Sequence, residues 1–285
     1  FFCCRYDPDV MSEHFELMAN FDHDAVAAAI SSPCLVITGK ADDLMPIRWV
    51  KKLHEHKIPV ISEIEFAGRH TNAKKICITG TNGKTTTTLL TYHILQKAGL
   101  NVGLGGNVGQ SFARQVAESK FDYYVLELSS FQLDGCFTFK ADVAILTNIT
   151  PDHLDRYQYD FSLYVKSKFN IAKNQSPNDY LILCKDDPAT LDYLNKNILT
   201  PKILFFTMNE SLNADGAYVN DNEIMIRVNG EPFSISINDL SLKGKHNQYN
   251  SMAAGISSRV AEIRNATIRR SEERRVGKEC LRLCR

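Results

Sequence analysis

The chain has 285 residues, of which 44% are hydrophobic and 23% charged, and its 33 Lys and Arg are balanced by 33 Asp and Glu. This composition excludes a disordered tail protein and a fibrous repeat, and the zero net charge disfavours a nucleic-acid partner, which requires a basic track. No run of about 18 apolar residues predicts a membrane span. Eight cysteines without a Cys-x-x-Cys pair indicate reduced thiols in a cytoplasmic protein, with Cys77 and Cys184 buried.

Apolar runs of strand length alternate with helical stretches through the middle of the chain. Near-continuous apolar strands that alternate with helices predict a mostly parallel sheet covered on both faces. Strands are expected at residues 75–79, 123–128, 143–149, 180–184 and 203–207, and helices at 84–98 and 161–173.

The pattern changes after residue 215. Short antiparallel strands are expected at 217–219, 223–228 and 231–237, followed by a helix at 247–263. The Asn229-Gly230 pair between the last two strands predicts a type I′ hairpin.

The strongest motif is the glycine-rich segment between the first expected strand and the first helix. Its glycines allow backbone N–H groups to point inward, and the helix N-terminus favours an anion. Lys84 can reach nucleotide phosphates, and the Thr85 hydroxyl can ligate a bridging Mg²⁺. The segment is shorter than the general G-x-x-x-x-G-K-[ST] pattern, and the alternative is a plain glycine-rich turn. The sequence thus predicts an α/β P-loop ATPase domain with a small antiparallel β subregion, in which ATP is bound by Gly80, Thr81, Asn82, Gly83, Lys84, Thr85 and Thr86.

Three further side chains are candidates for catalysis or metal binding. Glu127 ends the second expected strand, where the ligand crevice of an open α/β sheet lies, and could hold Mg²⁺. His153 follows the third strand, and Lys168 lies on the next helix. The alternatives are an ordinary surface glutamate, a structural histidine and a solvated lysine, and spacing alone does not decide between them.

Six segments together resemble the Mur ligase family. They are residues 80–86, 105–109, 126–133, 148–157, 164–171 and 244–254. The first and fourth are shared with folylpolyglutamate synthetases, whereas the Gly-Gly-Asn-Val-Gly and Leu-Glu-Leu-Ser-Ser-Phe-Gln-Leu runs are similar to the member that adds D-glutamate. The resemblance extends over residues 50–268.

The resemblance implies an ATP-dependent, ADP-forming amide ligase of peptidoglycan precursor synthesis. ATP would phosphorylate the carboxylate of UDP-N-acetylmuramoyl-L-alanine, and D-glutamate would attack the acyl phosphate to form the amide. Because two anions must meet, cations must neutralise them, and two Mg²⁺ sites are expected. We also expect a cytoplasmic monomer.

The same resemblance assigns roles to individual residues. Lys84 and Thr85 would hold the phosphates and one Mg²⁺. Glu127 and His153 match metal-site residues, and Lys168 matches a lysine that CO₂ carbamylates, which turns a cation into an oxygen ligand for the second Mg²⁺. Other matched positions lie near the substrates: Asn107, Ser129 and Ser130 near the UDP-sugar, and Asn247 and Asn250 near the adenine.

The ends of the chain depart from the family pattern of three domains. Residues 1–49 resemble an α/β-hydrolase strand and acid-bearing loop, with Asp42 or Asp43 as the acid, although no Gly-x-Ser-x-Gly elbow is present. Residues 50–67 match the end of a UDP-binding domain, 68–268 match the central ATP-binding domain, and 269–285 resemble translated cloning-adapter sequence. We expect a truncated or chimeric product without the carboxy-terminal domain. The alternatives are an inactive ATP- and Mg²⁺-binding fragment, a folylpolyglutamate synthetase-like ligase and a hydrolase remnant.

Overall fold

The computed structural model describes residues 36–38, 60–240 and 242–272. The hydrolase-like segment 1–49, apart from strand β1 (Val36–Thr38), lies outside the described residues, as does the adapter-like tail beyond Glu272. Strand β1 pairs in parallel with β2 (Val60–Ser62). Within the described ranges, no helix has the length and apolar character needed to cross a membrane.

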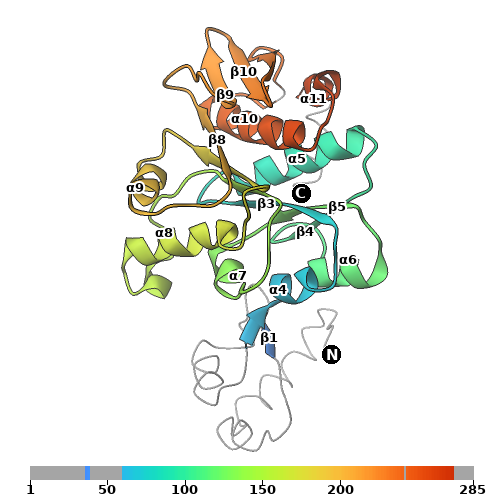
Figure 1. Ribbon diagram of the computed structural model, residues 1–285, viewed down its shortest axis with the longest axis vertical. Helices are drawn as coiled ribbons and strands as arrows, with labels where there is room; N and C mark the ends of the chain where they lie inside the picture. The colour runs from blue at the N-terminus through green and yellow to red at the C-terminus, as the bar shows by residue number, and fades with distance from the viewer. Residues whose placement is uncertain (1–35, 39–59, 241, 273–285) are drawn as a thin grey trace, which may run out of the picture.

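A nine-stranded sheet forms the centre of the protein (Figure 1). Its order is β11-β10-β9-β8-β7-β6-β3-β5-β4, with parallel pairing from β4 to β9 and antiparallel pairing from β9 to β11. The mostly parallel sheet and its antiparallel part are therefore confirmed, although β9 also pairs in parallel with β8. The strands are β3 (Lys74–Thr79), β4 (Val102–Gly106), β5 (Tyr123–Glu127), β6 (Val143–Leu146), β7 (Tyr180–Cys184), β8 (Lys202–Thr207), β9 (Gly216–Asn220), β10 (Glu223–Val228) and β11 (Glu231–Ser236).

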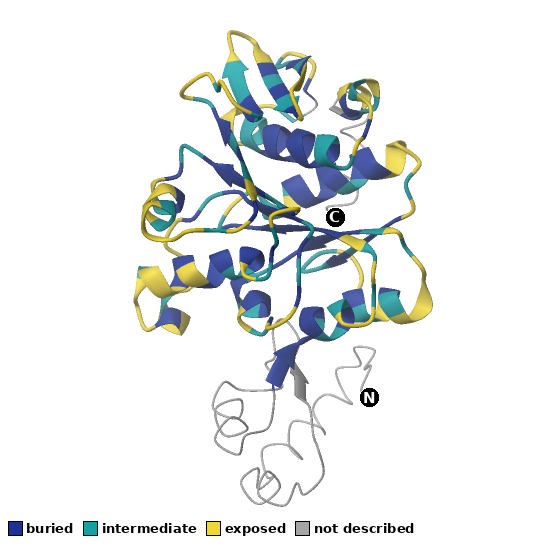
Figure 2. Cartoon of the chain, viewed as in Figure 1, coloured by how far each residue is buried: buried dark blue, intermediate teal, exposed yellow. Residues whose placement is uncertain are grey.

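Helices cover both faces of this sheet, as predicted. Because side chains alternate along a strand, Ile76 and Ile78 of β3 enter one core and Cys77 enters the other. Figure 2 shows the buried residues gathered in the sheet and on the inner faces of the helices. On one side lie α5 (Lys84–Lys97), α10 (Lys245–Val260) and α11 (Asn265–Glu272), and on the other α4 (Glu63–Gly68), α6 (Phe112–Glu118), α7 (Ser130–Asp134) and α8 (Phe161–Phe169), while α9 (Pro188–Lys196) follows β7 (Figure 1).

Local turns agree with the sequence in some places and differ in others. Asn229 and Gly230 have φ of 55° and 78°, as a type I′ hairpin requires. The expected helix 161–173 is shorter, because α8 ends at Phe169 and a 3₁₀ turn, η2 (Asn170–Ala172), follows. Cys77 and Cys184 are buried free thiols, as predicted.

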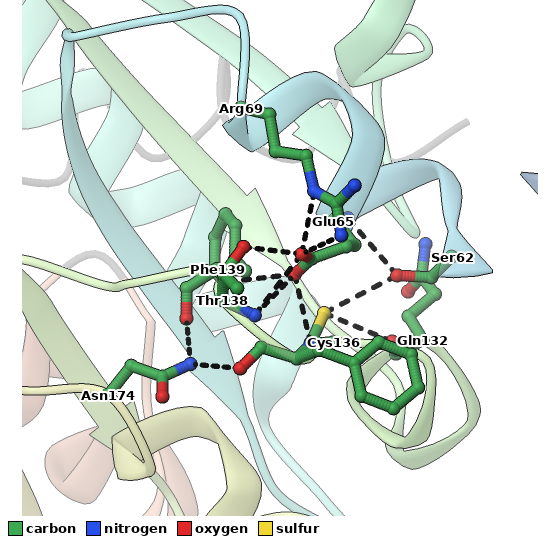
Figure 3. Close-up of polar contacts among 9 residues, drawn as sticks. Ser62, Glu65, Arg69, Gln132, Cys136, Thr138, Phe139 and Asn174 are labelled. Atoms are coloured by element: carbon green, nitrogen blue, oxygen red, sulfur yellow. Dashed lines mark hydrogen bonds and ion pairs between the residues drawn. The ribbon is translucent and has the colours of Figure 1, made fainter. Parts of the chain in front are cut away.

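A buried carboxylate, that of Glu65, joins α4 to the loop before β6 (Figure 3). It is 0% exposed and accepts hydrogen bonds from the backbone N–H groups of Phe137, Thr138 and Phe139 at 2.7–3.1 Å. The Thr138 hydroxyl and the Arg69 guanidinium also donate to it, at 2.6 Å and 2.8–2.9 Å. Burial raises the pKa of Glu65, but these hydrogen bonds together lower it more, to about 2.

Candidate functional site

The loop between β3 and α5 depends on two glycines. Gly80 and Gly83 have φ of 142° and 83°, which favour residues without a Cβ. A Cβ at Gly80 would collide with the Thr147 hydroxyl, and one at Gly83 would collide with the Asn250 amide oxygen. Both the backbone conformation and the close neighbours therefore require glycine at these two positions.

The segment that follows β6 holds this loop in place. The backbone N–H of Asn82 donates to Asn148 Oδ1 at 2.9 Å, and its carbonyl accepts from Asn148 Nδ2 at 3.0 Å and Thr147 Oγ1 at 2.6 Å. The Thr81 N–H donates to the Asn148 carbonyl at 2.8 Å, and the Thr81 hydroxyl donates to the Thr150 carbonyl at 3.1 Å. The protein itself thus fixes the shape of the loop, through Asn148 and Thr150 of the 148–157 motif and through Thr147, which the sequence placed only in the expected strand 143–149.

Two lysine amines donate to carbonyl groups of the same loop. Lys84 Nζ lies 2.8 Å from the Thr81 oxygen, and Lys168 Nζ lies 2.8 Å from the Gly80 oxygen. Lys168 is only 2% exposed, so it is not a solvated lysine. Burial, and next the nearby charge of Lys84, lower the pKa of Lys168 to about 7. The amine therefore carries a large neutral fraction near pH 7.

Glu127 ends β5, the strand beside β3, as the sequence predicted. It is 1% exposed, so the alternative of an ordinary surface glutamate is excluded. Its Oε1 accepts a hydrogen bond from Asn107 Nδ2 at 2.5 Å, whereas its Oε2 is buried and has no hydrogen-bond partner within the described part of the chain. A buried carboxylate oxygen without a donor suits a cation, and this one lies at the carboxyl end of the sheet.

His153 is more open than the other candidates. Its backbone is left-handed, with φ 48° and ψ 35°, and its side chain is 57% exposed with Nε2 3.5 Å from Asp152 Oδ2. Its ring packs edge-on against Phe131, with centroids 5.3 Å apart, and the Arg156 guanidinium lies 4.0 Å from the centre of the same ring. Phe131, which the sequence placed in the 126–133 motif without a role of its own, therefore packs against both His153 and Arg156, at the two ends of one turn.

A cavity of about 560 Å³ adjoins the glycine-rich loop. Phe206 and Tyr249 contribute aromatic rings to it, and Asp186 accepts a hydrogen bond from the Tyr249 hydroxyl at 2.7 Å. Asp186 follows the carboxyl end of β7, so the positional rule that singled out Glu127 could have found it. The lining also includes Asn82, Gly83, Thr147, Asn148, Thr150, Cys184, Asp187, His246 and Asn250.

The two asparagines expected near an adenine lie at different depths. Asn250 lines the cavity, is 6% exposed, and accepts a hydrogen bond from the Thr87 hydroxyl at 3.2 Å. Its Nδ2 donates to Asn247 Oδ1 at 3.1 Å, and Asn247 Nδ2 donates to the Lys243 carbonyl at 2.8 Å. Asn250 thus lies directly against the loop at Gly83, and Asn247 holds the Asn250 amide by a hydrogen bond.

The remaining predicted residues lie around the first turns of two helices. Thr85 is exposed and Thr86 half-buried in the first turn of α5. Ser129 is the N-cap of α7 and forms a capping box with Gln132, while Ser130 is buried. The Ser129 hydroxyl is therefore already engaged in holding its own helix.

Comparisons with known proteins agree on one family. The model of the Mur ligase middle domain matches residues 78–258. The UDP-N-acetylmuramoylalanine--D-glutamate ligase of Bacteroides fragilis is 51% identical over 226 residues, which are 78% of this chain and 50% of that protein. The protein of the same name from Porphyromonas gingivalis is 47% identical over 228 residues, 80% of this chain and 50% of that protein. The chain therefore spans about half the length of the curated relatives it matches.

Solved structures share the fold at low identity. The UDP-N-acetylmuramate:L-alanyl-gamma-D-glutamyl-meso-diaminopimelate ligase from Neisseria meningitides has a TM-score of 0.59 at 22% identity, over 94% of this chain and 87% of that chain. MurF from Acinetobacter baumannii has a TM-score of 0.57 at 16% identity, over 87% of this chain and 61% of that chain. At these identities the two structures support the arrangement of strands and helices and nothing finer.

Proposed function

The chain belongs to the Mur ligase family, and from this premise we propose that it supplies the ATP-binding part of a ligase that joins D-glutamate to UDP-N-acetylmuramoyl-L-alanine. The observation that carries the proposal is the pre-shaped loop at Gly80–Gly83, next to the strand that ends in the buried, half-paired carboxylate of Glu127. The N–H groups of Thr81 and Asn82 are already bonded to Asn148, so an anion would be bound by the N–H groups at the start of α5, and a nearby carboxylate oxygen can hold the divalent cation that accompanies it.

The nucleotide would lie along the loop and in the adjoining cavity. The phosphates would lie along the segment from Gly80 to Thr86 and contact the N–H groups in the first turn of α5 and the Lys84 amine. To reach them, that amine would give up its hydrogen bond to the Thr81 carbonyl. The adenine and ribose occupy the cavity between Phe206, Tyr249 and Asn250. Asn amides suit a purine edge because they offer both a donor and an acceptor.

Two magnesium ions are proposed at the carboxyl ends of the strands. The donor set suits Mg²⁺, because Glu127 and Thr85 offer oxygen atoms, and one of them is a buried carboxylate oxygen without a partner. Within the described ranges no three His, Cys, Asp or Glu side chains are gathered at one point, so phosphate and water oxygens would supply the remaining ligands. Bound Mg²⁺ would neutralise the phosphate charge as the substrate carboxylate approaches. His153 and a carbamate on Lys168 are the proposed protein ligands of the second ion.

The carbamate proposal is supported by the surroundings of Lys168. Its amine is buried within hydrogen-bond reach of the Gly80 carbonyl, and the Lys84 charge lies near. The neutral amine would attack CO₂, form a new N–C bond and release one proton to solvent. We expect ¹³C-bicarbonate to give a carbamate carbon signal in the wild type and none in Lys168→Arg. A signal of equal size in both proteins would contradict this assignment.

Three polar residues that follow strands β4 and β5 are proposed to lie beside the UDP-sugar substrate. They are Asn107, after β4, and Ser129 and Ser130, after β5. The zero net charge supports a protein without a nucleic-acid partner. We further propose that the enzyme is a cytoplasmic monomer with no membrane partner.

Calorimetry of Mg²⁺-ATP binding tests the proposal. Lys84→Ala should weaken binding by at least about tenfold, because a charge-assisted contact to phosphate is lost. Lys97→Ala is the matched control, since it removes a lysine from the opposite end of the same helix. Equal binding by wild type and Lys84→Ala would refute the phosphate role. Phosphate release that depends on D-glutamate would separate the ligase from an inactive ATP-binding fragment, and release that depends on a folate would favour the folylpolyglutamate synthetase-like alternative.

A further inference from the structure

Asn107 donates two hydrogen bonds to Glu127, one from its backbone N–H and one from its side-chain amide. The backbone N–H of Asn107 donates to the Glu127 carbonyl oxygen at 2.8 Å, and the side-chain Nδ2 donates to Glu127 Oε1 at 2.5 Å. Gly106, just before it, has φ 92°, and a Cβ there would collide with the same carbonyl oxygen. The turn after β4 is therefore built so that an asparagine can lie directly against this glutamate.

The contact leaves the two oxygens of the carboxylate in different states. Oε1 is engaged by the Asn107 amide, and Oε2 is buried without a hydrogen-bond partner in the described ranges. Amide and carboxylate cannot rotate independently while Nδ2 and Oε1 are joined. Such contacts behind a metal ligand orient it, and their loss typically weakens metal binding.

We propose that Asn107 is a positioning residue for the carboxylate of Glu127, which it fixes so that Oε2 is the oxygen available to a divalent cation. This inference rests on the proposed function, because the cation is the one that would accompany ATP. It assigns Asn107 a role that differs from contact with the UDP-sugar. Asn107 Oδ1 is also buried without a hydrogen-bond partner among the described residues, so direct ligation by Asn107 is the competing outcome.

The test measures how much Mg²⁺ improves ATP binding to the full chain. ATP affinity is determined by calorimetry in Mg²⁺ and in EDTA, and Mn²⁺ binding in the presence of ATP is followed by loss of the free Mn²⁺ signal in electron paramagnetic resonance. Asn107→Ala should reduce the gain from metal about tenfold and leave affinity in EDTA unchanged. Adding Asn107→Ala to Glu127→Gln should cause no further loss, because Asn107 acts through the glutamate.

Asn101 provides a matched control on the same strand. It precedes β4 as Asn107 follows it, and its Nδ2 donates to the Lys120 carbonyl at 2.8 Å rather than to a carboxylate. Asn101→Ala should leave the gain from metal unchanged. Thermal unfolding checks that each variant is folded. If Asn107→Ala does not fold, Asn107→Ser, which keeps a shorter hydrogen-bond donor, takes its place. That variant should also reduce the improvement of ATP binding by Mg²⁺.

Asn107→Asp separates positioning from ligation. It keeps an oxygen at the end of the side chain and removes the N–H donor, so a positioning role predicts loss of the gain from metal. Retention of the gain in Asn107→Asp would overturn the proposal in favour of direct ligation, and retention in Asn107→Ala would overturn it outright. A wild type that binds ATP no better with Mg²⁺ than with EDTA refutes both the proposed metal site and this inference, whereas the variant results alone leave the metal site standing.

Discussion

Glu65 and Glu127 are both buried glutamates, 0% and 1% exposed, yet their surroundings differ. Three backbone N–H groups, a hydroxyl and a guanidinium donate to Glu65 (Figure 3). Glu127 has one side-chain donor and an oxygen with no partner in the described ranges. Buried polar groups are normally hydrogen-bonded, so the carboxylate of Glu65 is satisfied within the protein, whereas that of Glu127 keeps one oxygen without a donor among the described residues. At equal burial, the hydrogen-bond partners therefore distinguish a structural carboxylate from the one that we propose as a cation ligand.

Removing the satisfied carboxylate should have the largest effect on stability. Glu65→Ala leaves the N–H groups of the loop before β6 without an acceptor, and we expect the free energy of unfolding to fall by about 4 kcal/mol. Urea unfolding followed by circular dichroism measures the change. Glu118→Ala, which removes an exposed glutamate paired with Arg114, is the control and should have little effect. A loss as small as that of the control would contradict the assigned role of Glu65.

Protonation of Glu65 at low pH should also lower the free energy of unfolding. The pKa of Glu65 is about 2 in the folded protein, below its usual value of 4.5, so its stabilising effect is complete above pH 4.5 and is lost as the pH falls toward 2. Glu65→Gln should therefore flatten the decline of unfolding free energy in this pH window. Urea unfolding at several pH values tests this expectation, and an unchanged slope would mean that other carboxyls dominate acid unfolding.

A smaller change should follow from removing one donor. Thr138→Val keeps the shape of the side chain but deletes the 2.6 Å hydrogen bond to Glu65. We expect a loss of about 1 kcal/mol in the free energy of unfolding and a higher Glu65 pKa, because four other donor groups remain. The pKa can be measured by NMR titration of the side-chain carboxyl carbon. A loss as large as that of Glu65→Ala would show that the hydroxyl holds the loop alone.

The smallest expected effect concerns the other glutamate. Glu127→Gln removes a buried charge that has one unpaired oxygen, so we expect the free energy of unfolding to change by less than about 0.5 kcal/mol or to rise. The same variant should lose the Mg²⁺-dependent part of ATP binding. Urea unfolding and calorimetry on one sample separate the two results. A loss of several kcal/mol would place Glu127 with Glu65 as a structural carboxylate.

The sequence predicted the elements whose signals come from residues close together along the chain. The strand, glycine-rich loop and helix from β3 to α5 were expected within one residue of their observed bounds, because apolar run and glycine spacing are local signals. Strand β4 was missed, since three of its five residues are glycines and it has no apolar run. Helix α7 was also missed, although Ser129 and Gln132 have the spacing of a capping box, which is a readable signal.

The site was harder to predict, because burial and distant contacts decide it. The backbone donors to Glu65 lie 72–74 residues away, so no local pattern announces them. Lys168 resembled a solvated lysine, yet α8 turns it inward on the same face as the buried Tyr164, one helical turn earlier. The unpaired oxygen of Glu127 depends on the packing of β3, β4 and β5 together, which spacing does not reveal.

The turn that carries Asn107 has a second consequence, at the margin of the sheet. Strand β4 is the last strand on its side, and a free strand edge can recruit another chain and start aggregation. After Asn107 the chain folds back along this edge, where Gln110 forms a bridge with Gly105 and its N–H donates to the Leu104 carbonyl. The Gln115 side chain covers the same carbonyl at 2.7 Å. The segment that carries Asn107 therefore also occupies part of the β4 edge, where another chain could otherwise add as a strand.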